Sequence, residues 1–574
     1  MSPAARLAGN AIGAVAQRSR SIPWWKQTTV YQVYPRSFAD KNGDGIGDLA
    51  GLIDRLDYLA DLGVETLWLS PFYRSPQADF GYDISDHYDV APEYGNRDDV
   101  PRLVEALHSR GMKLVLDMVL NHTSDRHPWF LDARAARDSH QRDWYLWKDG
   151  RQPGGRAPPN NWRSMIGGSG WRWDPATEQW YFATFLPFQP DLNWRNPAVK
   201  RAMLDVVRHW LALGVDGLRL DLFNALYKDA SFADNPRGYR LIPREDNPHG
   251  FLQHHLHTLD HADTIGFTRE LRAVTDEFSH PPRFLVGEVF GSPATLRRYC
   301  GEEGDGLHLV FLFKAMRTPL RAAAFRALLE EVEQSFPDPL LPTWVFANHD
   351  RPRAIDRLGG DARRAKLLAA LQLTARGVPF IYYGDEIGME HSPIAVADAL
   401  DPIAARFRFV PSWLSPRLRR HGILLNRDEC RRPMQWSAAR HAGFSPPETD
   451  ATWLPLHPAS AVCNVAAQTG DPDSILSCYR RMLALRRSSA ALSGGSLQLL
   501  PAGEGPRQLL SFRRTAGDET AHVVLNFSSR PVPLDPTRHA AAPAWSSLRD
   551  GVLDGEARRV LRPWEAIVHL EVGR

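Results

Sequence analysis

Acidic and other polar side chains follow several short apolar segments of the 574-residue chain, always near the point where the segment ends. Asp221 ends the segment at 215–221, Glu288 lies near the end of 283–289, and Asp350 follows 343–349. Carboxyl groups can act as general acids, general bases or nucleophiles, according to whether they are protonated. A single Asp after a strand is most often a turn residue or a helix cap. The repetition of the pattern is what indicates chemistry.

The apolar segments themselves predict the elements that position these side chains. Eight of them are rich in β-branched and aromatic residues and almost continuously apolar, which is typical of strands buried on both faces. Amphipathic stretches lie between most of them, and several end in Gly, a helix C-terminal signal. The pattern predicts an α/β fold, a (β/α)₈ TIM barrel, with a doubly wound open sheet as the alternative. The eight segments are VYQVYPRSF, ETLWLS, KLVLDMVL, VDGLRLD, RFLVGEV, LHLVFLF, TWVFANH and VPFIYY.

In a barrel the carboxyl ends of all strands meet on one face, where the active site is built. The fifth segment would bring Glu288 to that face, and polar residues of other segments would join it. The third contributes Asp117, Asn121 and His122, the fourth Arg219 and Asp221, and the seventh Asn348, His349 and Asp350. The sequence therefore predicts a single site with several carboxylates, an arginine and two histidines.

Two stretches break the alternation, and the last part of the chain follows another pattern. Residues 125–195 are rich in Trp, Pro, Gly and Asn and are too long for a structureless loop, so we expect an inserted small domain. Residues 388–470 are similarly irregular. Beyond residue 492, short alternating runs predict an antiparallel β-sandwich domain over 492–574. The barrel would then comprise 1–124 and 196–491, with 1–22 as a flexible tail.

Composition excludes several classes of function. The net charge is +2 and no long single-sign run accompanies it, so nothing indicates binding to nucleic acid or to an anionic membrane. No apolar run reaches the roughly 18 residues of a membrane span. The four cysteines form no C-x-x-C pair, which fits a reducing compartment. We expect a soluble cytoplasmic protein, a monomer or a homodimer, and no organic cofactor.

The loop at 40–48 alternates oxygen-bearing groups with glycines and could bind a metal ion. The ligands would be the side chains of Asp40, Asn42, Asp44 and Asp48 and the carbonyl of Ile46. Hard cations such as Ca²⁺ or Mg²⁺ prefer such oxygen ligands. An EF-hand would need Glu at the twelfth position, where Gly51 stands. The alternative is a polar turn held by its own hydrogen bonds, and any metal here would be structural.

The chain resembles the α-amylase family of glycoside hydrolases, and within it the α-glucosidase and oligo-1,6-glucosidase branch. Each matching segment is short, but together and in this order they are specific. They are YQVYPRSFAD, DKNGDGIGD, GVETLWLSP, FGYDISDH, DMVLNHTS, QPDLN, GVDGLRLD, GEVF, FANHD, GVPFIYYGDE and RRPMQW.

The resemblance implies a role for each matching residue. Asp221 resembles the nucleophile, Glu288 the general acid/base, and Asp350 the carboxylate that holds sugar hydroxyls. Arg219 would keep Asp221 ionised, because an adjacent cation lowers the pKa of a carboxyl group. The remaining matches bind the sugar: His122 and His349 by hydrogen bonds, Tyr82 as a stacking platform, and Asp79 with Arg431 as an ion pair that closes the pocket.

The resemblance also implies an activity. We expect an exo-acting retaining α-glucosidase that hydrolyses short α-glucosides from the non-reducing end, with possible transglucosylation. Leu222, beside the nucleophile, favours α-1,4 bonds of the maltose type, with sucrose possible, because its bulk branches one carbon later than that of Val. The alternatives are a glucosyl transferase or isomerase, such as a trehalose or isomaltulose synthase, and an α-1,6-specific oligo-1,6-glucosidase. A non-catalytic relative would lack carboxylates and carry a transmembrane helix.

Overall fold

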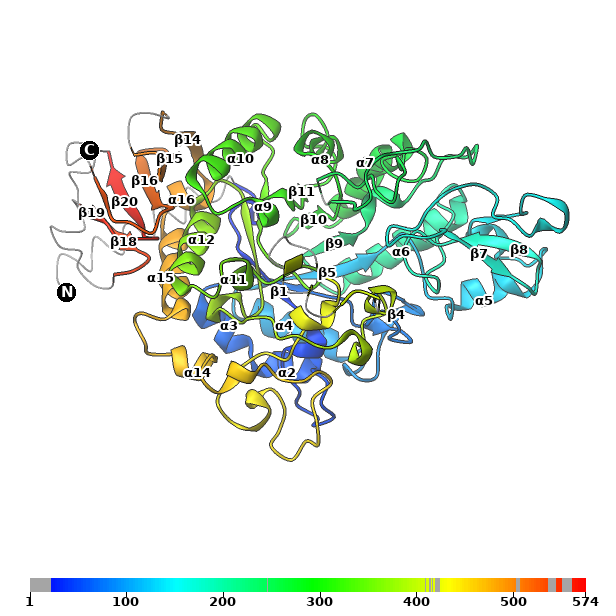
Figure 1. Ribbon diagram of the computed structural model, residues 1–574, viewed down its shortest axis with the longest axis horizontal. Helices are drawn as coiled ribbons and strands as arrows, with labels where there is room; N and C mark the ends of the chain where they lie inside the picture. Colours follow the sequence, from blue (N-terminus) through cyan, green and yellow to red (C-terminus); the bar gives the residue numbers. More distant parts are fainter. Residues whose placement is uncertain are drawn as a thin grey trace.

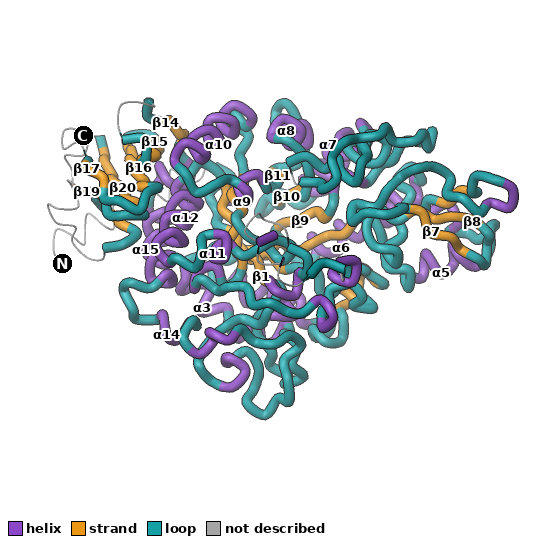
Figure 2. Tube along the Cα trace, in the orientation of Figure 1, coloured by secondary structure: helices purple, strands orange, loops and turns teal. Residues whose placement is uncertain are grey.

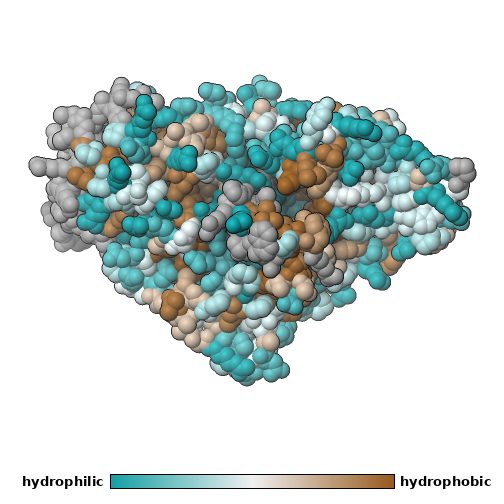
Figure 3. All heavy atoms as spheres, viewed as in Figure 1, coloured by the Kyte–Doolittle hydropathy of each residue, from teal (hydrophilic) through white to brown (hydrophobic). Residues whose placement is uncertain are grey.

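A computed structural model describes residues 22–573 except 245, 408, 412–413, 415–416, 419–423, 502–505, 535–542 and 550–559. The tail expected at 1–22 lies outside the described residues, apart from Ile22. In the described parts of the chain, no helix has the length and apolar character needed to cross a bilayer. The face shown in Figure 3 is largely hydrophilic, with small hydrophobic clusters between the polar residues.

Eight parallel strands form the central sheet, and all eight segments expected to be strands contribute one. The sheet lies in the middle of the molecule in Figures 1 and 2. Their spatial order is β11-β10-β9-β5-β2-β1-β13-β12. Except for β11 and β12 at the two ends, strands that follow one another along the chain are therefore paired in the sheet, and the first strand, β1, pairs with the last, β13. A doubly wound sheet would reverse its strand order at a switch point. The barrel expectation is therefore confirmed. The strands are β1 (Val30–Val33), β2 (Thr66–Leu69), β5 (Lys113–Val119), β9 (Gly217–Asp221), β10 (Phe284–Gly287), β11 (Leu309–Val310), β12 (Thr343–Val345) and β13 (Val378–Tyr382).

A side chain closes the barrel between β11 and β12, the two ends of the hydrogen-bonded series. The hydroxyl of Thr343 on β12 donates to the carbonyl of Val310 at 2.9 Å. The same hydroxyl accepts from the backbone N–H of Leu312 at 2.9 Å. Thr343 is fully buried, so these bonds replace ladder bonds that the short strands do not form.

Amphipathic helices surround the sheet, and local signals explain their ends. Asn196 caps α6, Pro197 occupies the first turn, and α6 buries Met203 and Trp210 against the barrel. The amphipathic stretch at 49–63 forms two helices, which meet at Arg55. The main helices are α2 (Leu49–Asp54), α3 (Leu56–Leu62), α4 (Asp99–His108), α6 (Pro197–Ala212), α7 (Ala262–Asp276), α8 (Pro293–Cys300), α10 (Ala322–Ser335), α12 (Ala362–Thr374) and α15 (Ile475–Ser488).

The insertion after β5 has its own small sheet and core, at the right of Figure 1. Helix α5 (Pro128–Ala135) precedes the antiparallel strands β6 (Trp147–Lys148), β7 (Trp171–Asp174) and β8 (Gln179–Phe182), in the order β6-β8-β7. Trp162, Trp171 and Phe182 pack together as a separate apolar cluster. The chain returns to the barrel through Asp191, which forms a β-bridge with His122.

The C-terminal part forms an antiparallel domain at the opposite end of the molecule (Figure 1). Arg514 of this domain is buried and donates to the carbonyl of Thr374 at the end of α12. The sheet order is β14-β15-β16-β20-β18, with a separate pair β17-β19. The strands are β14 (Ser496–Leu499), β15 (Leu509–Ala516), β16 (Glu519–Asn526), β17 (Val532–Pro533), β18 (Trp545–Ser546), β19 (Val560–Leu561) and β20 (Ala566–Val572).

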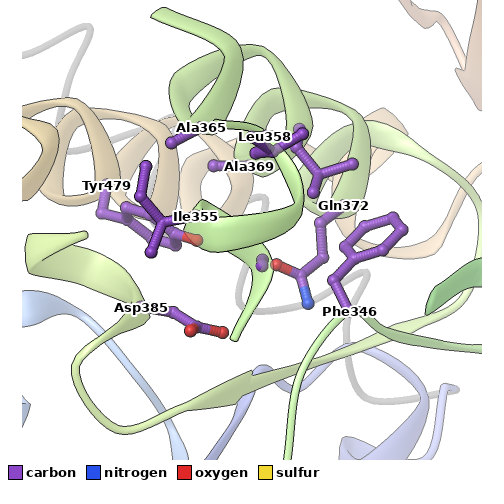
Figure 4. A pocket seen from close by; sticks show the side chains of 10 residues that line it. Phe346, Ile355, Leu358, Ala365, Ala369, Gln372, Asp385 and Tyr479 are labelled. Atoms are coloured by element: carbon purple, nitrogen blue, oxygen red, sulfur yellow. The ribbon is translucent and has the colours of Figure 1, made fainter. Parts of the chain in front are cut away.

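A small cavity lies outside the barrel, between α11 (Ala354–Arg357), α12 and α15. Asp385, Gln372 and Tyr479 point toward it among apolar side chains (Figure 4). Its volume of about 20 Å³ is enough for one water molecule and far too small for a sugar. Burial raises the pKa of Asp385 to about 7. This cavity is part of the scaffold and separate from the residues predicted to be catalytic.

The barrel closure by Thr343 gives a stability prediction. Thr343→Val keeps the shape of the side chain but leaves the buried N–H of Leu312 and carbonyl of Val310 without their partner. We expect the free energy of unfolding to fall by about 1–3 kcal/mol in urea titration. Thr343→Ser keeps the hydroxyl and is the matched control, with a smaller loss. Equal stability of the Val variant and the wild type would show that backbone bonds close the barrel unaided.

Candidate active site

One buried arginine holds three carboxylates at the carboxyl ends of the strands. Nη1 of Arg219 donates to Asp117 at 2.7 Å and to Asp221 at 2.8 Å, and Nη2 donates to Glu288 at 2.6 Å. Asp117 lies directly across from Arg219 in the β5–β9 register. Asp221 ends β9, and Glu288 follows β10. The structure thus brings these four residues together at the carboxyl ends of the strands. The separation of about 5–5.5 Å expected of a retaining pair stays a prediction.

The three carboxyl groups all titrate above their ordinary range. Burial raises the pKa of Glu288 to about 7, against the lowering effect of Arg219. Burial likewise raises the pKa of Asp221 to about 6, although Arg219 opposes it. The pKa of Asp117 is raised to about 6 for the same reason. Arg219 was expected to keep Asp221 ionised, and it acts in that direction, but burial has the larger effect.

Asp350 lies in the opposite electrostatic environment. Its Oδ1 accepts from Arg431 at 2.7 Å and from Arg427 at 3.1 Å, and its Oδ2 is 3.3 Å from Nε2 of His349. Burial would raise the pKa of Asp350, but His349 and the two arginines outweigh it and hold the pKa well below the usual range. Asp350 is therefore ionised near neutral pH, where Glu288 can still keep its proton.

A chain of buried polar groups connects His349 to the arginine cluster. Gln32 lies 2.8 Å from Nδ1 of His349, and Nε2 of His349 lies 2.7 Å from the Tyr82 hydroxyl. Tyr82 donates in turn to Asp117 at 2.9 Å. The rings of Tyr82 and His349 stack with an interplanar angle of 2°. Tyr82 is thus held rigidly from one side, and its role as a platform for a sugar stays a prediction.

His122 lies beside this chain. Its Nε2 is 3.2 Å from the carbonyl of Tyr82, and burial lowers its pKa to about 4. Behind it, the buried Lys228 forms an ion pair with Asp191 and donates to Asn121 at 2.8 Å. His122 is therefore neutral, and it is positioned from both the barrel and the inserted domain.

The expected ion pair of Asp79 with Arg431 is wrong in its arginine. Asp79 accepts from Arg427 at 2.6 Å and from Gln189 at 3.0 Å, whereas Arg431 binds Asp350 and the carbonyl of His349. Arg427 also binds Asp401 at 2.8 Å. Sequence reasoning missed Arg427, although it stands in NRDEC directly before RRPMQW. The physical reason is the short helix Arg427–Cys430, capped by Asn426, which separates the two arginines by one turn.

The chain makes a sharp turn directly after Asp221. Leu222 has φ 41° and ψ 44°, in the left-handed region, and the 3₁₀ helix Phe223–Ala225 follows. The Leu222 side chain is 5% exposed and packs with Ala225 and Leu259, against the partly buried Met165 and Phe290. Asn224, two residues after Leu222, is fully buried and donates to Asp260 and to the carbonyl of Phe290.

The loop at 40–48 is held together by hydrogen bonds from its own backbone. Asp40 accepts from Gly43 at 2.7 Å and from Gly45 at 2.9 Å. Asp48 accepts from Lys41 and Asn42 and also caps α2 through Gly51, and Asp44 accepts from Ile46. Within the described parts of the chain, no three His, Cys, Asp or Glu side chains are grouped to hold a metal. The donor set of Asp40, Asn42, Asp44, Ile46 and Asp48 consists of oxygens and suits a hard cation chemically, so the metal stays a prediction.

The loop gives a prediction about metal removal. If Ca²⁺ or Mg²⁺ binds there, adding it to chelator-treated protein should raise the melting temperature by at least about 2 °C, because a ligand of the native state stabilises that state. Asp44→Ala should abolish the response while leaving the Asp48 cap of α2 intact. Activity at 25 °C should change less than the melting temperature. If chelator, Ca²⁺ and Mg²⁺ all leave the melting temperature unchanged, the loop is a turn only.

Comparisons with known proteins agree with the geometry. A family model described as the catalytic domain of α-amylase matches residues 32–495. A probable α-glucosidase of Rhizobium meliloti (strain 1021) is 39% identical over 524 residues, which are 88% of this chain and 89% of that protein. A probable oligo-1,6-glucosidase 2 of Bacillus subtilis (strain 168) is 35% identical over 575 residues, covering 95% and 98%. The crystal structure of an α-glucosyl transfer enzyme is 35% identical, with a TM-score of 0.83, and covers 96% of this chain and 100% of that one. The chain therefore belongs to the α-amylase family of glycoside hydrolases, in its α-glucosidase and oligo-1,6-glucosidase branch.

Proposed function

We propose that the protein is an exo-acting retaining α-glucosidase that removes glucose from the non-reducing end of short α-glucosides. The observation that carries the proposal is the sharing of Arg219 by Asp221 and Glu288, which makes the two carboxyl groups neighbours. Glu288 has the higher pKa, about 7, and Asp221 the lower, about 6. Two carboxyl groups with pKa values separated in this order are suited to act as acid and nucleophile.

The mechanism follows from these two protonation states. Glu288 gives its proton to the glycosidic oxygen as that bond breaks, and Asp221 attacks the anomeric carbon to form a covalent glucosyl ester. Glu288, now ionised, removes a proton from water, which displaces Asp221 and regenerates both groups. Two inversions at the same carbon leave the product in the α configuration. Asp350 is ionised throughout and is suited to accept hydrogen bonds from sugar hydroxyls.

Exo action is supported by the ion pairs around Asp79 and Asp350. Arg427 connects Asp79, Asp350 and Asp401, and Arg431 binds Asp350 from a second direction. Besides Asp350, the members of this network are all buried: Arg427, Arg431, Asp79 and Asp401. Buried hydrogen-bonded charges are costly to separate. We infer that they form a closed end of the pocket, against which only a terminal glucose fits.

A glucosyl transferase or isomerase is the second candidate, because the α-glucosyl transfer enzyme covers nearly the same fold. Transfer and hydrolysis share the glucosyl–Asp221 intermediate and differ only in whether water or a sugar accepts the glucose. The apolar cluster of Leu222, Leu259, Met165 and Phe290 includes the residue next to the nucleophile, and an apolar wall there disfavours water. Product analysis separates the two. With maltose, two glucose molecules per maltose consumed support hydrolysis, whereas one glucose with a new, longer oligosaccharide supports transfer. With sucrose, equal glucose and fructose support hydrolysis, and a new disaccharide without that release supports isomerisation.

The carboxylate roles are tested by isosteric substitutions. Asp221→Asn and Glu288→Gln should each lower kcat by at least about a thousandfold, because the nucleophile or the acid is removed. Circular dichroism and thermal melting serve as the folding control. Glucose should first appear as the α-anomer, measured by NMR during the reaction. A folded Asp221→Asn protein with near-normal activity, or the β-anomer as first product, would contradict the mechanism.

The same assignments predict the pH profile of kcat/KM. Asp221 must be ionised, so activity is lost as the pH falls below about 6. Glu288 must be protonated, so activity is lost as the pH rises above about 7. We expect a narrow bell whose acid limb belongs to Asp221 and whose alkaline limb belongs to Glu288. A profile that is flat from pH 5 to pH 9 would exclude these roles.

Linkage preference is tested by comparing maltose with isomaltose. The Leu222 side chain turns into the apolar cluster with Leu259, which supports an open approach for an α-1,4-linked sugar. We expect kcat/KM to favour maltose by about tenfold, the scale of one methylene of shape in a pocket. Leu222→Val should shift the ratio toward isomaltose, with Leu222→Met as the control that keeps it. The ratio is the quantity to follow, because Val also strains the left-handed backbone. A wild type that prefers isomaltose would show that another loop sets the linkage.

A further inference from the structure

Leu222 has left-handed backbone and contacts both proposed catalytic residues: it follows Asp221 in the chain, and its N–H faces the side chain of Glu288. Its φ of 41° and ψ of 44° belong to a region that residues other than Gly, Asn and Asp seldom adopt. Neither the sequence of the turn nor the proposed mechanism requires a residue in this conformation. Strained backbone at a site persists only when the surroundings determine it, and it is a reason to look for a function.

The turn points two successive backbone N–H groups at the same residue. The N–H of Leu222 is 3.3 Å from Oε2 of Glu288, and the N–H of Phe223 donates to the main-chain carbonyl of Glu288 at 2.9 Å. In extended backbone, successive N–H groups point to opposite sides. Helical or left-handed backbone brings them to one side, where they form a concave donor group for an anionic oxygen. The conformation of Leu222 is therefore what allows both donors to reach Glu288.

The N–H of Leu222 and the guanidinium of Arg219 together define which side-chain oxygen of Glu288 is held. Oε2 accepts from Nη2 of Arg219 at 2.6 Å as well as from Leu222. A proton on Oε1 leaves both of these hydrogen bonds intact, whereas a proton on Oε2 would compete with them. The Leu222 N–H also lowers the pKa of Glu288, in opposition to the larger raising effect of burial. Both effects are specific to Glu288 and do not depend on the Leu222 side chain.

We propose that the turn at Leu222 is a positioning device for the acid/base, which holds Oε2 of Glu288 and leaves Oε1 to carry the proton toward the substrate. Leu222 is thus a positioning residue through its backbone, in addition to any effect of its side chain on linkage. The inference rests on the proposed function of Glu288. The competing explanation is that the turn merely results from packing of the side chain among Ala225, Leu259, Met165 and Phe290.

Substitutions that change the backbone preference of residue 222 separate the two explanations. Leu222→Ile has the same atoms as Leu but is β-branched, which makes the left-handed region unfavourable. Leu222→Met has a similar volume without β-branching and is the matched control. Leu222→Gly removes the side chain and relieves the strain. The turn should therefore survive in the Met and Gly variants and be displaced in the Ile variant.

The decisive measurement is the alkaline limb of the kcat/KM profile. Loss of a donor to the ionised carboxylate raises its pKa, so the limb of Leu222→Ile should move up by about 0.5 pH unit, and kcat should fall by about tenfold. Leu222→Met and Leu222→Gly should keep the wild-type limb, even if the Gly variant is less stable. A limb unmoved in a folded Ile variant, or moved equally in the Met variant, would overturn the proposal. If the Ile variant does not fold, a limb shifted in the Gly variant would overturn it.

A second readout keeps this test separate from the proposed function. The pKa of Glu288 can be followed without turnover by NMR of ¹³C-labelled glutamate carboxyls, with Glu288→Gln used to assign the signal. If Asp221→Asn or Glu288→Gln stays active, the proposed function fails, but the NMR titrations of the Ile and Met variants still report on the turn. If those titrations coincide while both catalytic substitutions abolish activity, the function stands and the positioning proposal fails.

Discussion

The rest of the site depends on a charge imbalance: one buried guanidinium faces three buried carboxyl groups. Arg219 binds Asp117, Asp221 and Glu288, and its side chain is fully buried. A single positive charge cannot compensate three negative charges away from water, because uncompensated buried charge is costly. The cluster lowers that cost by keeping a proton, and the pKa values of all three carboxyl groups are raised accordingly. The proton that the proposed mechanism requires on Glu288 thus follows first from burial and then from the other acids near the same arginine.

A second cluster has a smaller imbalance, because two arginines face three carboxyl groups there, and the two clusters differ in protonation. Two arginines, Arg427 and Arg431, serve Asp350, with Asp79 and Asp401 as further partners. With more positive charge nearby, Asp350 stays ionised, and its negative charge in turn raises the pKa of Glu288. The protonated acid and the permanently ionised carboxylate are therefore coupled. Their neighbours, more than their own chemical type, decide which of the two carboxyl groups is protonated, and the proposed roles follow from that difference.

The residues that could be predicted from the sequence are those fixed by strand periodicity. Asp221, Glu288 and Asp350 follow buried strands, and barrel topology sends the ends of such strands to one face. Arg427 could not be found this way, because it lies in the irregular stretch after β13, where no period relates sequence to position. Its neighbour Arg431 was paired with Asp79 although it binds Asp350. A difference of one helical turn within a loop decides that pairing, and only tertiary packing fixes it.

The conformation of Leu222 lay beyond sequence reasoning for a related cause. Left-handed backbone is signalled by Gly, Asn or Asp, and Leu gives no such signal. The break between α2 and α3 at Arg55 likewise cannot be predicted from the sequence, because no Gly or Pro stands at that position. In both places the surrounding structure overrides local preference. Such overrides concentrate where a backbone group must reach a particular partner, as the Leu222 N–H reaches Glu288.

The barrel and its insertions divide the site between chemistry and selectivity. Register within the sheet fixes the Arg219 cluster, since Asp117 and Arg219 are direct partners across β5 and β9. The inserted domain supplies Gln189 to Asp79 and Asp191 to Lys228, and it also places Met165 beside Leu222. A change in that domain can reshape the acceptor side without moving a strand end. Under the proposed function, the same carboxylates can be combined with walls that admit water or walls that admit a sugar, and we propose that the loops, more than the carboxylates, decide between hydrolysis and transfer.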